Sequence, residues 1–189
     1  MVTIKKLTDW SDALTAARIT ANKEPSYSYP SDSFIKQIIS AEHSPIRCVL
    51  YSIYWDKIES WVVTHLLRHH IGTLPFVGTQ REDRTGVAHS ERKRNELIPF
   101  MFIVNAQSII NISRRRLCSL ASKETRSVWE SVLFILKTLD PLLVEKCVPD
   151  CCYRGFCAEY KCCGYVQTED YKILRSEYIK GGILPLEGV

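Results

Sequence analysis

The 189-residue sequence has no apolar run long enough to cross a membrane. No apolar signal core follows the two lysines of its opening, MVTIKKLTDW. It also has no internal repeat and no low-complexity tract. These absences argue against a helical membrane protein and against a repeat array. We therefore expect one soluble, cytoplasmic domain over residues 1–189, with enough chain to bury a proper core.

A strongly basic stripe of the kind that dedicated duplex-binding proteins use is missing as well. The chain carries 25 Lys and Arg residues against 21 Asp and Glu, for a net charge of +4. This mild excess is compatible with a phosphate-bearing ligand but does not identify one. With 46% hydrophobic and 24% charged residues, the composition is typical of a globular protein.

Hydrophobic periodicity predicts a mainly helical protein with a minority of strands. The predicted helices cover residues 9–20, 31–40, 56–69, most of 97–120 after Pro99, and 123–139. The short run RCVLYSIY, residues 47–54, is rich in β-branched and aromatic side chains and predicts a strand. Residues 72–86 are predicted to form a loop, and Pro141 to stop or kink the helix before it.

The stretch RHHIGTLPFVGTQREDR, residues 68–84, places cations at the end of an apolar helix and continues into a glycine-bearing, charged loop. Arg68 can fork onto a phosphate, while His69 and His70 can donate to an anion or stack on a flat ring. Further donors follow in the loop: Thr73, Thr79, Gln80, Arg81 and Arg84. We interpret the stretch as an anion site. The competing interpretation is a helix end whose cations match its dipole, followed by a surface loop.

A second candidate is NAQSIINISRRRLCSLASKETR, residues 105–126. Asn105 and Arg116 are eleven residues apart, about three helical turns, so they share a helix face. Three consecutive arginines cannot all share that face. One can therefore point at a ligand while its neighbours meet solvent or another subunit. The competing interpretation is a solvated basic patch.

Cysteine is the one chemically reactive residue present in excess, with eight in the chain. Six of them fall within residues 147–163: Cys147, Cys151, Cys152, Cys157, Cys162 and Cys163. Cysteines so close together predict one local site, whereas a framework of disulfides would be distributed along the chain. Their spacings of three and four suit a tetrahedral zinc site. An iron–sulfur cluster, a redox dithiol pair, and reduced thiols in a turn-rich segment are the alternatives. Cys48 and Cys118 are predicted to be isolated buried thiols.

These motifs together resemble those of flavin-dependent thymidylate synthases. RHHIGTLPFVGTQR corresponds to the signature R-H-R-x-x-S-x-N-E-x-S-x-R-Y: Arg68 and His69 match, and His70 replaces the second arginine. EHSP, residues 42–45, resembles the family's H-x-S/T-P element, with Glu42 in place of the histidine. The segment from residue 105 is similar to N-A-R-S-L-x-N-F-L-x-L-R-x-x-x-x-A-Q-x-E-I. The residues in register are Asn105, Ala106, Ser108, Asn111, Arg116, Ala121 and Glu124.

The resemblance implies an α/β (α+β) fold, mainly helical with a small antiparallel sheet, and a homotetramer that binds FAD between subunits. It implies that the flavin contacts Ser44, Arg68, His69, His70, Asn105 and Asn111. The implied nucleotide-binding residues are His65, Thr79, Gln80, Arg81 and Arg116, of which Arg116 also polarises the pyrimidine and is the catalytic candidate. The implied reaction methylates dUMP at C5 to dTMP, with methylenetetrahydrofolate and NADPH as co-substrates. In such enzymes the cofactor carries the chemistry and the protein positions it.

The sequence also departs from the family pattern. Pro75-Phe76 stands where the signature has Asn-Glu, and His65 replaces the glutamine before it. Much of the helical stretch between the two motifs is missing. The residues implied to bind the flavin match the family pattern better than those implied to bind the nucleotide. We therefore expect a different nucleotide substrate, or a different product such as a hydroxymethylated nucleotide. Two alternatives stay open: a non-catalytic nucleotide or nucleic-acid binder on the same fold, and a metal or redox centre in residues 147–163.

Overall fold

The computed structural model describes residues 1–180, which form one antiparallel sheet with helices on one side. The strands are β1 (Val2–Lys6), β2 (Leu50–Glu59), β3 (Thr73–Val77) and β4 (Leu97–Asn105), in the order β1-β2-β4-β3. The helices are α1 (Trp10–Thr20), α2 (Asp32–Ser40), α3 (Ser60–Leu67), α4 (Glu82–Thr85), α5 (Ala106–Arg116), α6 (Lys123–Leu139), α7 (Pro141–Val144), α8 (Asp150–Arg154) and α9 (Glu169–Lys180). Short 3₁₀ helices cover Ser44–Cys48, His89–Glu91 and Tyr165–Gln167. The expected mainly helical fold with a small antiparallel sheet is confirmed.

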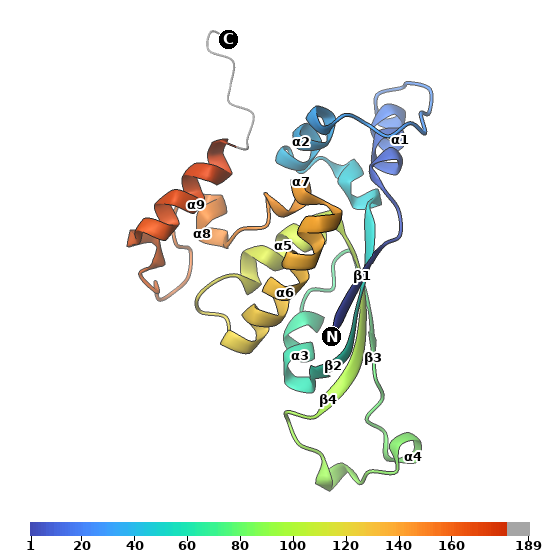
Figure 1. Ribbon diagram of the computed structural model, residues 1–189, viewed down its shortest axis with the longest axis vertical. Helices are drawn as coiled ribbons and strands as arrows, with labels where there is room; N and C mark the ends of the chain where they lie inside the picture. The colour runs from blue at the N-terminus through green and yellow to red at the C-terminus, as the bar shows by residue number, and fades with distance from the viewer. Residues whose placement is uncertain (181–189) are drawn as a thin grey trace.

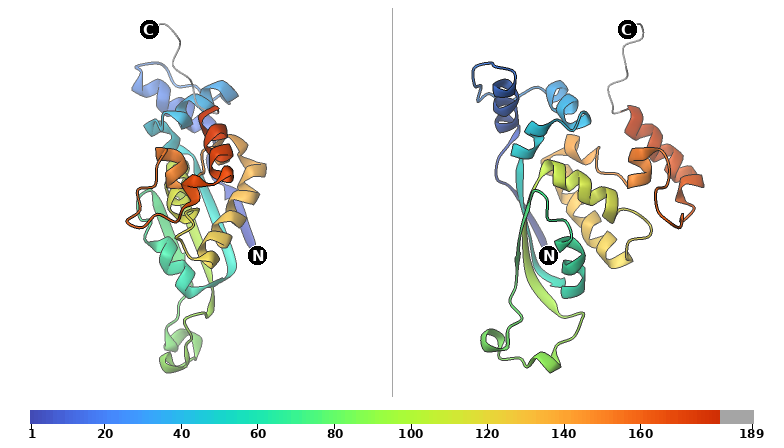
Figure 2. Two further views of the ribbon diagram at one scale, coloured as in Figure 1. Left: turned by 90° about the vertical axis from the view of Figure 1, so that its left-hand side faces the viewer. Right: turned by 180° about the vertical axis from the view of Figure 1, so that it is seen from behind.

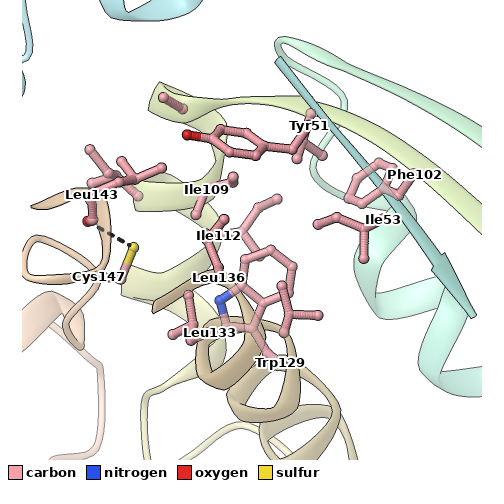
Figure 3. Close-up of a cluster of buried hydrophobic side chains, with 14 of the residues drawn as sticks. Tyr51, Ile53, Phe102, Ile109, Ile112, Trp129, Leu133, Leu136, Leu143 and Cys147 are labelled. Atoms are coloured by element: carbon pink, nitrogen blue, oxygen red, sulfur yellow. Dashed lines mark hydrogen bonds between the residues drawn. The ribbon is translucent and has the colours of Figure 1, made fainter. Parts of the chain in front are cut away.

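Helices α3, α5 and α6 cover one face of the sheet, and α8 and α9 form an outer layer beyond them (Figure 1, Figure 2). Successive side chains along a strand point to opposite faces of the sheet. Every second side chain of β2 and β4 therefore enters the core. The residues that meet there include Tyr51, Ile53 and Phe102 of the sheet with Ile109, Ile112, Trp129, Leu133 and Leu136 of the helices (Figure 3). The buried indole of Trp129 donates to Ser113 Oγ at 2.9 Å, so its polar atom is satisfied.

The other face of the sheet carries apolar side chains that no described element covers. It comprises Tyr54, Leu74, Phe76, Leu97, Met101 and Ile103, and we call it the bare sheet face. Leu74 is 59% exposed and Phe76 is 53% exposed. Both lie on β3, the edge strand, where they oppose Ile103 and Met101 of β4. Contiguous exposed apolar surface of this kind is typical of an interaction surface.

Asp140, directly after α6, ties the N-terminal elements to the helical layer. Its carboxylate accepts hydrogen bonds from Lys6 Nζ at 2.6 Å, Trp10 Nε1 at 2.9 Å and Tyr51 Oη at 2.5 Å. The carboxylate is almost fully buried, and three donors from β1, α1 and β2 compensate its desolvation. Burial, followed by the charge of Asp140, raises the pKa of Tyr51, so this phenol stays protonated and donates.

The predictions for α1, α2 and α6 are confirmed, and Asp9 and Ser31 cap the first two of these helices. The helices predicted over residues 56–69 and over most of 97–120 begin earlier in the sequence than the observed helices α3 and α5. Residues 56–59 continue β2 past a bulge between Trp55 and Ile58, and residues 97–105 form β4. In β4 the buried positions recur every second residue, which is the period of a strand and not of a helix.

The predicted loop over residues 72–86 contains β3 and α4, and β1 was not anticipated. Pro75 is compatible with β3 because this is an edge strand, where a missing N–H leaves no ladder bond broken on the open side. The predicted strand over residues 47–54 is displaced, since Ser44–Cys48 forms a 3₁₀ helix. Pro141 begins α7 after the break at Asp140. Within residues 1–180, no helix is both long and apolar enough to span a membrane.

Candidate functional site

A pocket of about 140 Å³ opens where the end of α3 meets one face of α5. Its lining residues are Arg68, His69, His70 and Ile71 from the first segment and Ser108, Asn111 and Ile112 from the second. The two motifs that the sequence analysis treated separately therefore meet at one place. Ile71, Ser108 and Ile112 were not proposed as site residues. Ser108 and Ile112 could have been found from their helical spacing with Asn111 and Arg116.

Gly72 makes this junction possible. Its φ of +68° is a left-handed conformation, and a Cβ there would lie 2.3 Å from Asn105 Nδ2 and 2.6 Å from Ser108 Oγ. The Ser108 hydroxyl donates to the Ile71 carbonyl at 2.7 Å, and the Asn105 N–H donates to the Gly72 carbonyl at 3.1 Å. Asn105 Oδ1 accepts from Ser108 N–H at 2.8 Å and so caps α5. Asn105 consequently holds the turn and does not line the pocket.

Arg116 reaches back from the end of α5 to the end of α3. Its Nε–H donates to His69 Nε2 at 2.9 Å and its Nη2 donates to the His65 carbonyl at 2.6 Å. His69 Nε2 must therefore carry a lone pair. Burial, and then the charge of Arg116, lowers the pKa of His69 to about 4, which keeps the ring neutral near pH 7. Arg68 is the fixed cation that lines this pocket, and Arg116 is a second fixed cation directly behind His69.

His65 lies on α3 beside Arg116. Its Nδ1 is 3.0 Å from Thr125 Oγ1 of α6, and its ring meets Trp61 edge-on. Burial, and then the charges of Arg116 and Arg68, lowers the pKa of His65. Burial and the charge of Arg68 also lower the pKa of Arg116. Bringing these groups together therefore concentrates positive potential that an anion would relieve.

The three consecutive arginines point in three directions. Arg114 pairs with Glu42, Arg115 pairs with Glu159 at 3.2 Å, and Arg116 turns to His69. In the described chain neither Arg68 nor Arg116 has a carboxylate within ion-pairing distance. The expectation that the arginines diverge is confirmed, and the alternative of a solvated basic patch does not hold for Arg114 and Arg116.

Glu42 lies behind the pocket in a polar network. It accepts from Gln107 Nε2 at 2.6 Å and from Arg114. Asn111 Oδ1 accepts from Gln107 at 3.3 Å and from Arg114 at 3.2 Å, which leaves the Asn111 amide hydrogens for the pocket. Ser44 is exposed on the adjacent 3₁₀ helix and does not line the pocket.

Thr79, Gln80 and Arg81 lie at the opposite end of β3 from Arg68. Gln80 Nε2 donates to Glu96 at 3.0 Å, and Arg81 pairs with Asp83 at 2.8 Å. The five extended residues of β3, at about 3.3 Å each, separate them from the pocket by roughly 16 Å. The prediction that they join Arg116 at one site is thus not met within a single chain.

The predicted zinc site is not formed. Among residues 1–180, no group of three or more His, Cys, Asp or Glu side chains is placed to hold a metal ion. The six candidate cysteines do not share one site. Cys147 lies in the main core and Cys152 in the small core under α9, while Cys162 and Cys163 are exposed, Cys151 and Cys157 being half-buried. Burial raises the pKa of Cys147 and of Cys152 to about 12, which keeps both as thiols.

The two cysteines predicted to be isolated and buried also differ. Cys48 is exposed. Cys118 is half-buried and borders a small pocket with Cys151, Cys157 and Cys163. Sequence spacing could not reveal this neighbourhood, because Cys118 comes from the end of α5 and the others from the segment around α8.

Comparison with known proteins identifies the fold. No family model matches the sequence, and no curated protein matches it. The flavin-dependent thymidylate synthase ThyX from Helicobacter pylori, complexed with FAD and dUMP, superposes with a TM-score of 0.61 at 15% identity, covering 78% of this chain and 99% of that chain. The UMP/dUMP methylase PolB from Streptomyces cacaoi, bound with 5-Br dUMP, gives 0.59 at 12% identity, covering 82% and 96%. This chain therefore has a divergent ThyX-like fold.

Proposed function

We propose that this protein is a flavin-dependent enzyme that transfers a one-carbon unit to C5 of a pyrimidine nucleotide, with dUMP as the first candidate. The observation that carries the proposal is the convergence of Arg68, His69 and Asn111 at one pocket, with Arg116 hydrogen-bonded to His69 beside it. That convergence occurs on a fold whose H. pylori example was complexed with FAD and dUMP. The product is dTMP or a variant such as a hydroxymethylated nucleotide.

The pocket suits the anionic part of FAD. Arg68, His70 and the Asn111 amide face it as donors, and no carboxylate lines it. Guanidinium and amide donors are the usual partners of pyrophosphate oxygens. In this proposal Asn105 acts through the Gly72 turn, and Ser44 completes the flavin site from the 3₁₀ helix beside α5. Bound FAD would supply the hydride, with methylenetetrahydrofolate donating the carbon and NADPH the reducing equivalents.

Arg116 is the residue placed to polarise the pyrimidine. His69 and the His65 carbonyl hold its Nε and Nη2, so the plane of the guanidinium is set and Nη1 remains for a ligand. A cation held in place before the reaction stabilises negative charge that develops on a carbonyl oxygen, without reorganising. The neutral His69 contributes by orienting Arg116 and adds no competing charge.

A second subunit would complete this site. Thr79, Gln80 and Arg81 carry suitable donors but project from the far end of β3, and the bare sheet face exposes apolar side chains nearby. We therefore propose a homo-oligomer, a tetramer as the family resemblance implies, in which the β3 end of one subunit reaches the Arg116 pocket of another. The nucleotide would then be bound by residues of both subunits.

The visible spectrum of the purified full-length protein tests the proposal. A yellow protein with oxidised flavin bands is expected, and dUMP should perturb those bands. Arg68→Ala should lower FAD occupancy by about tenfold or more, the loss expected for a charge-assisted hydrogen bond. Arg84→Ala is the matched control, because Arg84 is an exposed arginine of the same segment. Colourless protein that takes up no added FAD would contradict the proposal.

Arg116→Gln separates the two ligands. We expect it to bind FAD while losing the spectral response to dUMP and at least about a hundredfold of turnover. Equal turnover in Arg116→Gln and the wild type would remove Arg116 from the catalytic role.

The alternative of a non-catalytic nucleotide or nucleic-acid binder is motivated by the altered signature loop, by the shortened stretch between the two motifs and by the basic run over residues 92–94. Arg92 pairs with Glu96, and Arg94 lies 5.9 Å over the Trp61 ring. Two of its three cations are therefore already engaged. This alternative predicts salt-sensitive binding to polynucleotide without flavin, and flavin-dependent turnover of a mononucleotide would count against it.

A further inference from the structure

A second pocket, of about 440 Å³, lies where α2, the chain after α7, α8 and α9 meet. Its polar lining consists of Gln37, Ser40, Lys146, Tyr153, Arg175 and Tyr178. Among residues 1–180, no carboxylate lines it. Because α8 and α9 follow the segment that resembles the thymidylate synthases, this pocket belongs to a part of the chain outside that resemblance.

Lys146 is the unusual member of this lining. It is only 7% exposed, and its ammonium forms no hydrogen bond and no ion pair with the described residues. Its one close partner is the Tyr178 ring, 4.8 Å away. Lysine side chains are seldom this buried without a carboxylate or carbonyl partner. The Lys146 ammonium nitrogen is not among the fully buried atoms that lack a hydrogen bond, so it is accessible from the pocket that its side chain lines. Burial lowers the pKa of Lys146 even though the nearby Glu145 charge opposes the shift.

Two further groups face the same space without full satisfaction. The Ser40 hydroxyl oxygen is buried and has no hydrogen-bond partner. Arg175 donates from Nη1 to the carbonyls of Cys152 and Tyr153, and it forms no ion pair in the described structure. Glu42 is already paired with Arg114, whose guanidinium lies 3.5 Å from the Tyr153 ring centre.

We propose that this pocket binds the phosphate group of a small phosphorylated ligand, at a site separate from the Arg68–Asn111 pocket. Two cations and the amide of Gln37 line a space to which no residue of the described part of the chain contributes a carboxylate, and the unpaired Ser40 hydroxyl lies within its wall. An oxyanion with several acceptor oxygens can pair with Lys146 and Arg175 at once. A purely structural role for Lys146 is the competing explanation, because a cation over an aromatic ring is itself favourable.

Isothermal titration of the full chain tests the site, with inorganic phosphate and adenosine 5′-monophosphate as separate probes. Lys146→Met keeps the apolar length of the side chain and removes its charge. Lys146→Met and Arg175→Gln should each weaken binding by about tenfold or more. The matched control is Lys172→Met on α9, where Lys172 is 64% exposed and pairs with Glu169. It should bind like the wild type.

The two probes distinguish the source of the phosphate. Equal affinities indicate that the pocket recognises the free anion, and tighter binding of the monophosphate indicates a phosphate ester. Either result supports the site if Lys146→Met abolishes it. Without phosphate, Lys146→Met should unfold cooperatively with a Tm close to that of the wild type, which shows that the variant is folded. Phosphate should then raise the Tm of the wild type but not of Lys146→Met. Wild type that binds neither probe, or Lys146→Met that binds as well as the wild type, overturns the proposal. The titration needs no bound flavin, so it is independent of the proposed enzyme activity.

Discussion

His69 is neutral near pH 7, and its neutral ring can accept the hydrogen bond that orients Arg116. Its Nε2 accepts from Arg116, and its burial, with the charges of Arg116 and Arg115 nearby, disfavours the proton that a surface histidine would carry near its ordinary pKa. The positive charge at the pocket is therefore concentrated on Arg68 and Arg116. These are the two side chains with the geometry to bind a phosphate or a carbonyl oxygen.

The neutral state of His69 makes stability depend on pH. Its pKa falls from 6.5 to about 4 on folding, so the unfolded chain binds more protons between these values. The free energy of unfolding should therefore decrease as pH falls from about 6.5 to 4, with a His69 share on the order of 2 kcal/mol. Urea denaturation at several pH values measures this. His69→Gln, which still accepts from Arg116, should lose that share. Identical pH profiles for the two proteins would contradict the assignment.

At the scale of elements, the Gly72 turn sets how α3 and α5 meet. Gly72→Ala places a methyl group against Asn105 and Ser108 in a left-handed backbone, so we expect a loss of roughly 3 kcal/mol in urea denaturation. Gly86→Ala has nearly the same φ, +69°, with nothing within 4 Å of the new Cβ. It should lose only about 1 kcal/mol. Equal losses would mean that crowding at the Gly72 turn is unimportant.

Asp140 joins three elements to the end of α6. Asp140→Ala leaves Lys6, Trp10 and Tyr51 without their common acceptor, and we expect it to destabilise the protein by about 3–5 kcal/mol. Thermal unfolding would show it. Asp83→Ala removes an exposed pair with Arg81 and should cost less than about 1 kcal/mol. A small effect of Asp140→Ala would show that these elements are held by packing alone.

At the scale of the whole molecule, the bare sheet face and the separated halves of the site lead to the same expectation. Phe76→Glu introduces a charge into that face and should shift the protein from an oligomer to smaller species in sedimentation velocity. Turnover should fall with it if two subunits share the site. Phe156→Glu, at an aromatic residue that is 58% exposed near α8, should leave the assembly unchanged. A wild type that sediments as a monomer would refute the shared site.

Much of this molecule could be predicted from its sequence because several signals were local. The helical periods of α1, α2 and α6 and the ungapped segment from Asn105 to Glu124 all depend on neighbouring residues. The strands were harder. In β3 four consecutive residues, 74–77, are exposed and one of them is a proline, so this edge strand has no alternation of buried and exposed residues from which to predict it.

The hydrogen bond between Glu42 and Gln107 could not be predicted from the sequence, because the two residues are far apart along the chain. Glu42 departs from the family histidine and Gln107 from the family arginine, and only the folded chain brings their side chains to 2.6 Å. Each substitution alone suggests a damaged flavin site, whereas together they form a hydrogen-bonded pair behind Asn111. The cysteines show the opposite error. Their close spacing in the sequence predicts one cluster, but Cys147 and Cys152 are buried in two different hydrophobic cores.

The strand order also governs how the chain acquires its structure. No two neighbouring strands are joined by a tight turn: Val2 pairs with Trp55, Leu50 with Asn105, and Thr73 with Val104. Each ladder closes a long loop, so its contacts are non-local and slow to form. A nascent polypeptide leaving the ribosome therefore carries β1 without a partner until β2 emerges, and the sheet is complete only after β4. Aggregation during synthesis is consequently the hazard that this topology creates.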